Sequence, residues 1–246
     1  MVYSPMDMFA LAEAEPETTF VFAAIGFETT TPVYALLLEE IIERRIENIK
    51  LLTALKTMPG VISYLCEHGA EIDAFLAPGH VAAVTGSRLF EPLAKKHGIP
   101  FAVAGFEGEE ILEALCGIVK TCEESSDLGV VMNFYPSVVT EEGNTKAQKL
   151  VEKYFTRSDA AWRGMGVIPG TGMELREEYR KYDAGSSGLN EDNKRNAACC
   201  CDKILMGKMQ PQQCPLFGKV CTPLSPQGAC MVSEEGSCHA RFFAGE

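Results

Sequence analysis

Basic residues are scarce in this sequence. Lysine and arginine total 22 residues against 34 aspartates and glutamates, which gives a formal net charge of −12 at pH 7. Proteins that bind nucleic acid neutralise phosphates with clustered lysine and arginine. The sequence offers no basic stripe of that kind, so it argues against a nucleic-acid partner and is compatible with a basic protein partner.

Long apolar runs are missing as well. No stretch approaches the ~20 apolar residues that a membrane-spanning helix requires. The first twenty residues lack the basic segment and apolar core of a secretory signal. We therefore expect a cytoplasmic protein without a membrane partner. In that reducing compartment, clustered cysteines are more often metal ligands or redox thiols than structural disulfides.

Common signatures of enzymatic chemistry are also absent. No G-x-G-x-x-G or phosphate-binding loop follows a predicted strand, so a Rossmann-like enzyme that uses a nucleotide is a weak interpretation. The histidines, which form no convincing Ser–His–acid arrangement, are His68, His80, His97 and His239. The sequence leaves enzymatic activity open and favours an assembly or scaffold protein over a stand-alone enzyme.

Cysteine, by contrast, is concentrated at one end of the chain. Seven of the ten cysteines lie in residues 199–246: Cys199, Cys200, Cys201, Cys214, Cys221, Cys230 and Cys238. Prolines and glycines separate them, and such a segment can bury little apolar core, so a metal or a crosslink must stabilise it. The remaining three, Cys66, Cys116 and Cys122, are most simply small buried hydrophobic residues.

The spacing of the tail cysteines does not match common metal motifs. From Cys201 onward, successive cysteines are separated by 12, 6, 8 and 7 residues, without any C-x2-C pair. Thiolates from separate loops could still form an all-cysteine site, for which zinc or an iron–sulfur cluster is favoured. We expect Cys199 and Cys200 to be spare, because the side chains of adjacent residues point apart. His239 is more simply a surface or supporting residue than a ligand.

Before the tail, strand-like and helix-like segments alternate. Strands are expected at residues 19–25, 49–54, 74–77, 101–104, 129–135 and 162–168. Helices are expected at 32–48, 109–121, 142–155 and 173–183. A further helix begins with 61–67, another ends at 97, and a linker is expected at 184–196. This alternation predicts an α/β fold, with a Rossmann-like parallel sheet and helices on both faces.

A Gly-Phe-Glu sequence occurs twice, at residues 26–28 and 105–107, each time after a predicted strand and before a helix. Ligands of doubly wound sheets bind outside the carboxyl ends of the strands, so Glu28 and Glu107 could line one cleft. Alternatively, the phenylalanine packs, the glycine makes the turn and the glutamate caps a helix. His80, in a Pro-Gly-His turn, is either a cleft residue or an ordinary turn histidine.

An ordered set of motifs resembles the HypD family of hydrogenase maturation factors. The motifs are VYSPMDMFALA, FAAIGFETTTP, FLAPGHVAAVTGS, AGFEGEEIL, EEGNTKAQ, WRGMGVIPGTGMEL and CPLFGKVCTP with PQGACMVSEEGSC. Any single one would be weak evidence, whereas the ordered set is specific and spans nearly all of the chain.

The resemblance implies a scaffold on which the Fe(CN)2CO group of [NiFe]-hydrogenases is assembled, with a HypC-like small chaperone and a HypE-like cyanide donor as partners. It also implies a C-terminal [4Fe-4S] cluster held by four of five cysteines: Cys201, Cys214, Cys221, Cys230 and Cys238. Candidate residues of a cleft between two α/β domains are Gly26, Phe27, Glu28, Thr29, Thr30, Pro78, Gly79, His80 and Glu107. The alternative is a non-catalytic interaction protein with a structural zinc site in its tail.

The sequence departs from the family pattern at Leu55-Lys56, in the segment NFYPSVV and, above all, in its cysteine motifs. It contains neither the Cys-Gly-Gly-His nor the Cys-Pro-x-Cys motif, whose thiols the resemblance associates with the iron centre. We therefore expect an N-terminally truncated or split member. Its parts would be a Rossmann-like domain at 1–128, the remainder of a second α/β domain with a linker at 129–195, and an iron–sulfur domain at 196–246.

Two further expectations follow from that incompleteness. The incomplete domain should expose strand edges and apolar surface. The purified chain should bind about one four-iron cluster but show no Fe–CN or Fe–CO infrared bands.

Overall fold

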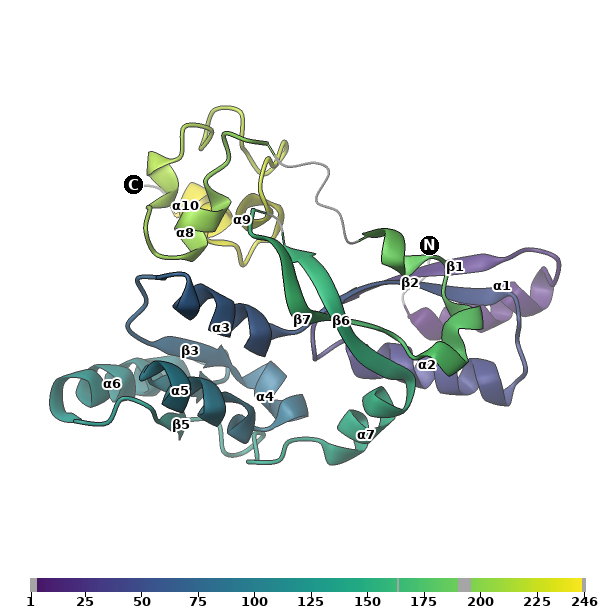
Figure 1. The fold of residues 1–246 in the computed structure, drawn as a ribbon, viewed down its shortest axis with the longest axis horizontal. Coiled ribbons are helices and arrows are strands. Elements are labelled where there is room, and N and C mark those ends of the chain that lie inside the picture. Colours follow the sequence, from purple (N-terminus) through teal and green to yellow (C-terminus); the bar gives the residue numbers. More distant parts are fainter. Residues whose placement is uncertain (1–3, 163, 190–195, 245–246) are drawn as a thin grey trace.

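The computed structural model describes residues 4–162, 164–189 and 196–244 (Figure 1). The strands are β1 (Phe20–Gly26), β2 (Ile49–Lys56), β3 (Phe75–Pro78), β4 (Phe101–Ala104), β5 (Val131–Asn133), β6 (Phe155–Trp162) and β7 (Gly166–Leu175). The α-helices are α1 (Met8–Ala14), α2 (Thr31–Glu43), α3 (Met58–Glu67), α4 (Gly79–Thr85), α5 (Glu91–His97), α6 (Gly108–Glu124), α7 (Thr145–Tyr154), α8 (Cys201–Leu205), α9 (Ala229–Val232) and α10 (Ser237–Phe243).

The strands form two sheets. The first has the order β1-β2-β7-β6 and the second the order β3-β4-β5. β1 runs parallel to β2, from Phe20 opposite Ile49 to Gly26 opposite Leu55. β3, β4 and β5 are parallel throughout. The predicted α/β class with parallel sheet elements is confirmed for these five strands, which alternate with helices along the chain.

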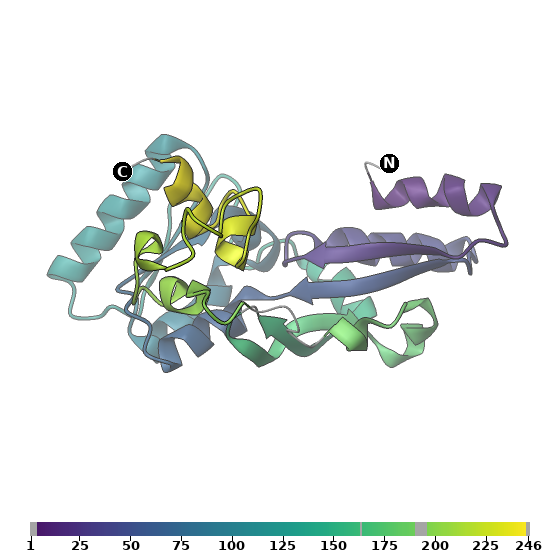
Figure 2. The ribbon, with the colours of Figure 1, turned by 90° about the horizontal axis from the view of Figure 1, so that it is seen from above.

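Each sheet has its own apolar core. In the first, α1 and α2 pack against β1 and β2, and Leu37, Leu38 and Ile41 of α2 are fully buried (Figure 2). In the second, β4 alternates. Phe101 and Val103 face the core that α4 and α5 share, and Ala102 and Ala104 face α6. Helices therefore cover both faces of this sheet, as the sequence predicted.

The prediction for residues 155–183 was wrong. A single strand at 162–168 and a helix at 173–183 were expected, whereas β6 and β7 form an antiparallel hairpin. The hairpin joins β2 in antiparallel fashion at Leu55 and Lys56. Gly164 and Gly166 both have positive φ and make the tight connection, and only a 3-10 helix (Glu177–Tyr182) follows. The charges of 173–183 suggested a helix surface, but they lie on a strand end and this short turn.

Strand pairing crosses residue 128. β5 pairs with β4, and the β6–β7 hairpin pairs with β2, so strands after residue 128 complete sheets that begin before it. The predicted division into domains at 128/129 stays a prediction. The expected linker at 184–196 lies partly outside the described residues. Its described part includes a 3-10 helix (Ser186–Leu189), and the Ser186 hydroxyl accepts a hydrogen bond from the Thr53 amide at 2.8 Å.

β1 is a terminal strand in the part of the chain that the structure describes. Its outward side chains Val21 and Ile25 are 51% and 63% exposed. The expected exposed strand edges and apolar surface concern the incomplete domain at 129–195, so that expectation stays a prediction.

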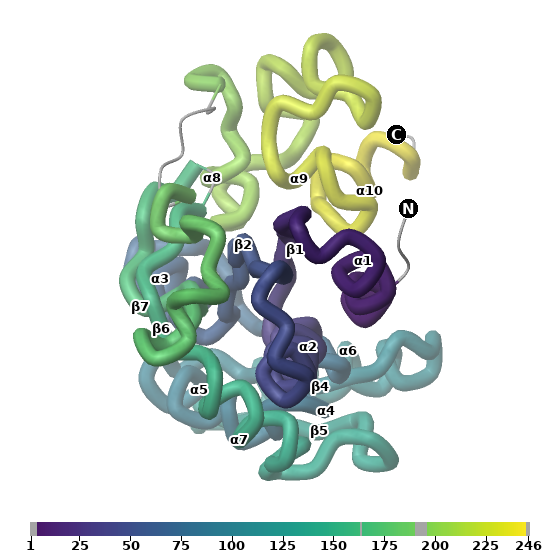
Figure 3. The backbone as a smooth tube through the Cα atoms, turned by 90° about the vertical axis from the view of Figure 1, so that its right-hand side faces the viewer, coloured from purple at the N-terminus to yellow at the C-terminus, as the bar shows by residue number. Residues whose placement is uncertain are grey.

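The cysteine-rich segment forms a third small core above the rest of the chain (Figures 1 and 3). It contacts the turn that follows α3. The Glu71 amide donates to the Met206 carbonyl at 2.8 Å, and Lys208 Nζ donates to the His68 carbonyl at 3.1 Å. In the described ranges, no helix combines the length and apolarity that crossing a bilayer requires.

Candidate functional site

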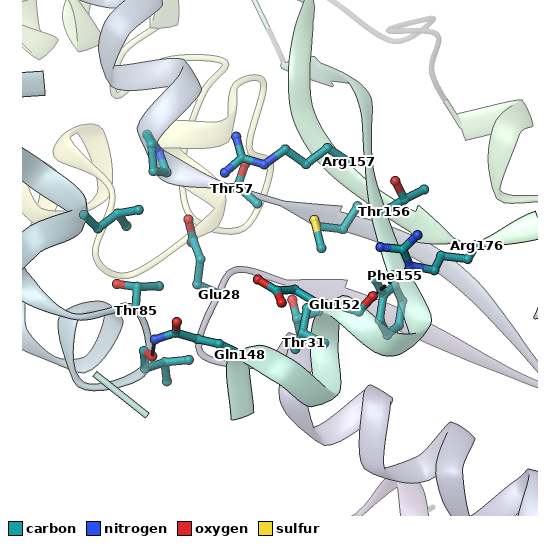
Figure 4. Close-up of a pocket in the computed structure, with 15 residues that line it drawn as sticks. Glu28, Thr31, Thr57, Thr85, Gln148, Glu152, Phe155, Thr156, Arg157 and Arg176 are labelled. Carbon is teal, nitrogen blue, oxygen red and sulfur yellow. Dashed lines mark hydrogen bonds between the residues drawn. The ribbon is translucent and has the colours of Figure 1, made fainter. Parts of the chain in front are cut away.

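A cavity of about 450 Å³ lies between elements that belong to the two sheets (Figure 4). Its lining comes from the β1–α2 turn, the start of α3, the end of α4, α7 and β6. Its polar lining includes Glu28, Thr57, Thr85, Gln148, Arg157 and Arg176. The cavity therefore stands at the carboxyl end of β1, where α/β sheets place their ligands.

The turn after β1 positions Glu28. Gly26 has a φ of +138°, and a Cβ at this position would lie 2.6 Å from Thr30 Oγ1, so only glycine fits without strain. Thr31 Oγ1 then donates to the Phe27 carbonyl at 3.0 Å and tightens the start of α2. These contacts turn the chain sharply and direct Glu28 toward the helix that follows the neighbouring strand.

Glu28 caps a helix, but not the one that follows it in sequence. Its Oε1 accepts a hydrogen bond of 2.7 Å from the amide of Met58, the first residue of α3. Its Oε2 is buried and has no hydrogen-bond partner among the described residues. Burial raises the pKa of Glu28 above its ordinary value, and the opposing effects of the Met58 amide and the Arg157 charge are smaller. The cavity thus holds a carboxyl group biased toward its neutral form.

The cavity also contains a second carboxylate, Glu152, and two donor-only guanidinium groups, Arg157 and Arg176. The Thr57 hydroxyl is buried and lacks a partner in the described chain. Arg157 extends from β6 toward Thr57 in Figure 4. Gln148 Nε2 is already used by the Val84 and Glu142 carbonyls, at 2.8 and 2.7 Å. The Thr57 hydroxyl and the Arg157 guanidinium together suit a ligand that accepts hydrogen bonds.

The predicted metal ligands lie in one core. The five thiols of Cys201, Cys214, Cys221, Cys230 and Cys238 are all buried and line one small cavity. Within the described residues, no three His, Cys, Asp or Glu side chains are arranged to hold a metal ion. The donor set nevertheless fits a thiophilic group by its chemistry, because buried soft sulfur atoms converge from separate loops.

Two of these thiols are in direct contact. Cys201 Sγ lies 2.7 Å from Cys230 Sγ, well beyond the ~2.05 Å of a disulfide. The contact with Cys230 lowers the pKa of Cys201 to about 6 and raises that of Cys230. Backbone amides assist: Cys230 N donates to Cys201 Sγ and Gln227 N to Cys221 Sγ, both at 3.3 Å. Such N–H···S bonds stabilise thiolate ligands.

Cys199, expected to be spare, also lines this cavity, whereas Cys200 does not. Burial raises the pKa of the Cys199 thiol to about 11. Gly228 makes room for it, since a Cβ there would lie 2.5 Å from Cys199 Sγ. His239 contacts Phe243, with ring centroids 4.9 Å apart.

A family model described as "HypD: Hydrogenase formation hypA family" matches residues 1–244. The chain belongs to the HypD family. A putative hydrogenase expression/formation protein of Methanocaldococcus jannaschii is 40% identical over 243 residues, which cover 97% of this chain and 66% of that protein. The hydrogenase maturation factors HypD of Cupriavidus necator and Rhizobium leguminosarum bv. viciae are 37% and 39% identical. Each match covers 100% of this chain, and 67% and 66% of the relative respectively. The chain spans about two thirds of the length of these relatives.

In this HypD family chain, Glu28 is the one member of the first group of predicted cleft residues that lines the cavity, and its described neighbours form the turn that carries it. Gly26 shapes the turn, and Phe27 lies beside Trp162, with ring centroids 6.2 Å apart. Thr29 is exposed, and Thr30 occupies the N-cap position of α2 without a capping hydrogen bond from its side chain.

The second group consists of Pro78, Gly79, His80 and Glu107, and none of these four residues lines that cavity. Pro78 is the N-cap of α4, and Gly79 fits where a Cβ would lie 2.6 Å from the Ala104 carbonyl oxygen. His80 is exposed and lies against Phe106 in a tilted arrangement, with ring centroids 4.6 Å apart. Glu107 is the exposed N-cap of α6.

The sequence interpretation missed Thr57, Arg157 and Arg176 as cavity residues. Arg157 was missed because β6 was not recognised. The segment FTRSDAAW, followed by a glycine-rich turn and a second strand-like run, carried a hairpin signal that could have located it.

The interpretation of Cys116 and Cys122 as buried residues was wrong. Both are exposed on α6, and Cys66 is half-buried. The face of α6 that packs on β4 is formed by Ala114 and Ile118, so these two cysteines point outward.

Proposed function

We propose that this chain acts as a scaffold in the maturation of [NiFe]-hydrogenases. In this proposal, its C-terminal core holds a [4Fe-4S] cluster and its body docks a HypC-like chaperone. In the full assembly, where another chain supplies the thiol motifs that this sequence lacks, the Fe(CN)2CO group would be assembled on this scaffold with cyanide from a HypE-like donor. Family membership supports the proposal, as do the names of the relatives. The observation that carries the cluster assignment is the gathering of five buried thiols in one core.

The cluster would supply electron transfer, at a potential tuned by hydrogen bonds to its sulfur ligands and by burial. Cys214, Cys221, Cys230 and Cys238 come from the chain after α8, and Cys201 opens that helix. Four of these five would be ligands. The amides of Gln227 and Cys230 would stabilise the negative charge on the sulfur atoms that they contact.

The cavity at Glu28 supports the scaffold role independently. Buried polar atoms without partners are costly, and a bound group can satisfy them. The Thr57 hydroxyl and Glu28 Oε2 are such atoms among the described residues. Cyanide ligands accept hydrogen bonds, so the donors of this cavity suit an iron–cyanide group as cargo.

The cluster is tested by anaerobic purification with iron, acid-labile sulfide and zinc analysis. We expect brown protein with about four iron and four sulfide per chain. Serine substitutions of Cys201, Cys214, Cys221, Cys230 and Cys238 should separate the ligands: four variants lose most of the iron and one retains it. Cys116→Ser and Cys122→Ser are matched controls, because both thiols are exposed on α6.

Two results would contradict the cluster. Colourless protein with zinc and no sulfide would support the structural zinc alternative. Unchanged iron content in all five variants would show that these thiols are not the ligands.

A further inference from the structure

Helix α6 carries apolar residues on the side that packs on its sheet and also on the side that is exposed. Ala114 is fully buried against β4, and Ile118 packs beside it. On the outward side, Leu112, Leu115 and Val119 are 62%, 45% and 54% exposed. Cys116 and Cys122 are exposed as well. We call Leu112, Leu115, Cys116, Val119 and Cys122 the outer stripe.

The outer stripe has the spacing of a helix face that packs against another protein element. Its members follow Leu112 at three, four, seven and ten residues, which places them on one side of the helix. Apolar residues at this spacing are the usual anchors of helix-mediated recognition. α6 lies at the periphery in Figures 1 and 2. The residues of α6 that pack on its sheet are Ala114 and Ile118, and neither belongs to the outer stripe.

The stripe begins close to the second Gly-Phe-Glu motif. Phe106, two residues before α6, is 65% exposed and lies against the exposed His80. This exposed aromatic pair therefore lies close in sequence to the start of the outer stripe. A partner bound along α6 would lie beside the Pro-Gly-His turn.

Charges on α6 indicate what kind of partner fits. The exposed carboxylates are those of Glu109, Glu113, Glu123 and Glu124, with Lys120 as the exposed cation of the helix. None of these four carboxylates forms an ion pair of 4 Å or less within the described residues. A second copy of this chain would bring like charges together, which disfavours self-association. A partner with lysine and arginine beside its apolar contact is complementary.

We propose that the outer stripe is the docking surface for a partner protein whose apolar contact face is bordered by basic residues. This inference rests on the proposed function, because it identifies the surface at which the chaperone of the scaffold docks. The apolar residues would supply the buried centre of the interface, and the carboxylates of α6 would form its polar rim.

The experiment measures binding of the purified HypC-like chaperone to the full chain by isothermal titration calorimetry. Leu115→Ser/Val119→Ser should raise Kd by at least about tenfold, because it removes apolar contacts at the interface centre. Val33→Ser/Leu36→Ser is the matched control, since these α2 side chains are also 38% and 45% exposed. The control should change Kd by less than about twofold, a difference well under 1.4 kcal/mol. Circular dichroism and thermal melts check that both variants remain folded.

A second variant tests the charge argument. Glu109→Lys/Glu113→Lys should weaken binding and reduce its dependence on salt, because it removes the attraction to a basic partner.

The outcomes separate this inference from the proposed function. Equal binding by wild type and Leu115→Ser/Val119→Ser would overturn the assignment of the outer stripe as the docking surface and leave the scaffold proposal standing. No binding by the wild-type chain would overturn chaperone docking itself and the stripe with it. A concentration-dependent dimer that the stripe variant abolishes would assign the surface to a second copy, which also overturns the proposed partner.

Discussion

At the scale of single residues, Glu28 has one oxygen bonded to a helix terminus and the other without a partner among the described residues, inside a cavity. Glu28→Ala should lower the free energy of unfolding by about 1–3 kcal/mol, because the Met58 amide at the start of α3 loses its acceptor. Glu28→Gln keeps an acceptor oxygen there and should cost much less. Urea unfolding at fixed pH measures both.

The same residue predicts a pH dependence. Burial raises the pKa of Glu28 above 4.5, so its proton is held more tightly in the folded chain than in the unfolded chain. Its contribution to stability is fully present below about pH 4.5 and is lost as pH rises through the folded pKa. Wild type should therefore lose stability relative to Glu28→Gln as pH rises above about 4.5, because the glutamine has no proton to release. Parallel curves for the two proteins would contradict this, and exposed Glu43→Gln should follow wild type.

At the scale of elements, the β6–β7 hairpin depends on one buried threonine. Thr171 accepts a hydrogen bond from Trp162 Nε1 at 2.7 Å and donates to the Ile168 carbonyl at 2.8 Å. Thr171→Val keeps the shape, removes both bonds and should lower the free energy of unfolding by about 1–3 kcal/mol. Trp162 is the only tryptophan, so its fluorescence reports this change directly.

Thr121→Val is the matched control for the hairpin, because the Thr121 hydroxyl contacts only the sulfur of Met132 among the described residues. It should leave both the emission spectrum and the stability nearly unchanged. A Thr171→Val protein with wild-type stability would show that the hairpin does not rely on these bonds.

The sequence predicted those elements whose signal is local. Short apolar runs and amphipathic helices located β1 to β5 and the helices α2, α3, α5 and α6, because each pattern is complete within one segment, whereas α4 was not predicted. The hairpin escaped because Thr171 and Leu175 face inward only once β7 pairs with β2, a long-range contact. For the same reason Glu28 was identified from its motif, whereas Arg157 was not. The cysteine core followed from composition, but the outward face of α6 did not, since apolar residues lie on both of its sides.

At the scale of the whole molecule, the cysteine-rich segment is attached to the body at a tight backbone contact. Gly207 has a φ of +75°, and a Cβ there would lie 2.5 Å from the Glu71 carbonyl oxygen. The neighbouring Met206 carbonyl accepts a hydrogen bond from the Glu71 amide. Close approach of two backbones without a side chain between them therefore holds the segment on the turn after α3.

Gly207→Ala tests this attachment, and Gly218→Ala provides the matched control. Gly218 has a φ of +68° with nothing within 4 Å of the added Cβ, so both substitutions carry a similar backbone cost of about 1–2 kcal/mol. Only Gly207→Ala adds a collision with the Glu71 carbonyl. The Glu71 amide should then exchange with deuterium at least about tenfold faster in Gly207→Ala than in Gly218→Ala, because its bond to Met206 is lost. Equal exchange in the two variants would mean that the segment is held by other contacts, such as that of Lys208 with the His68 carbonyl.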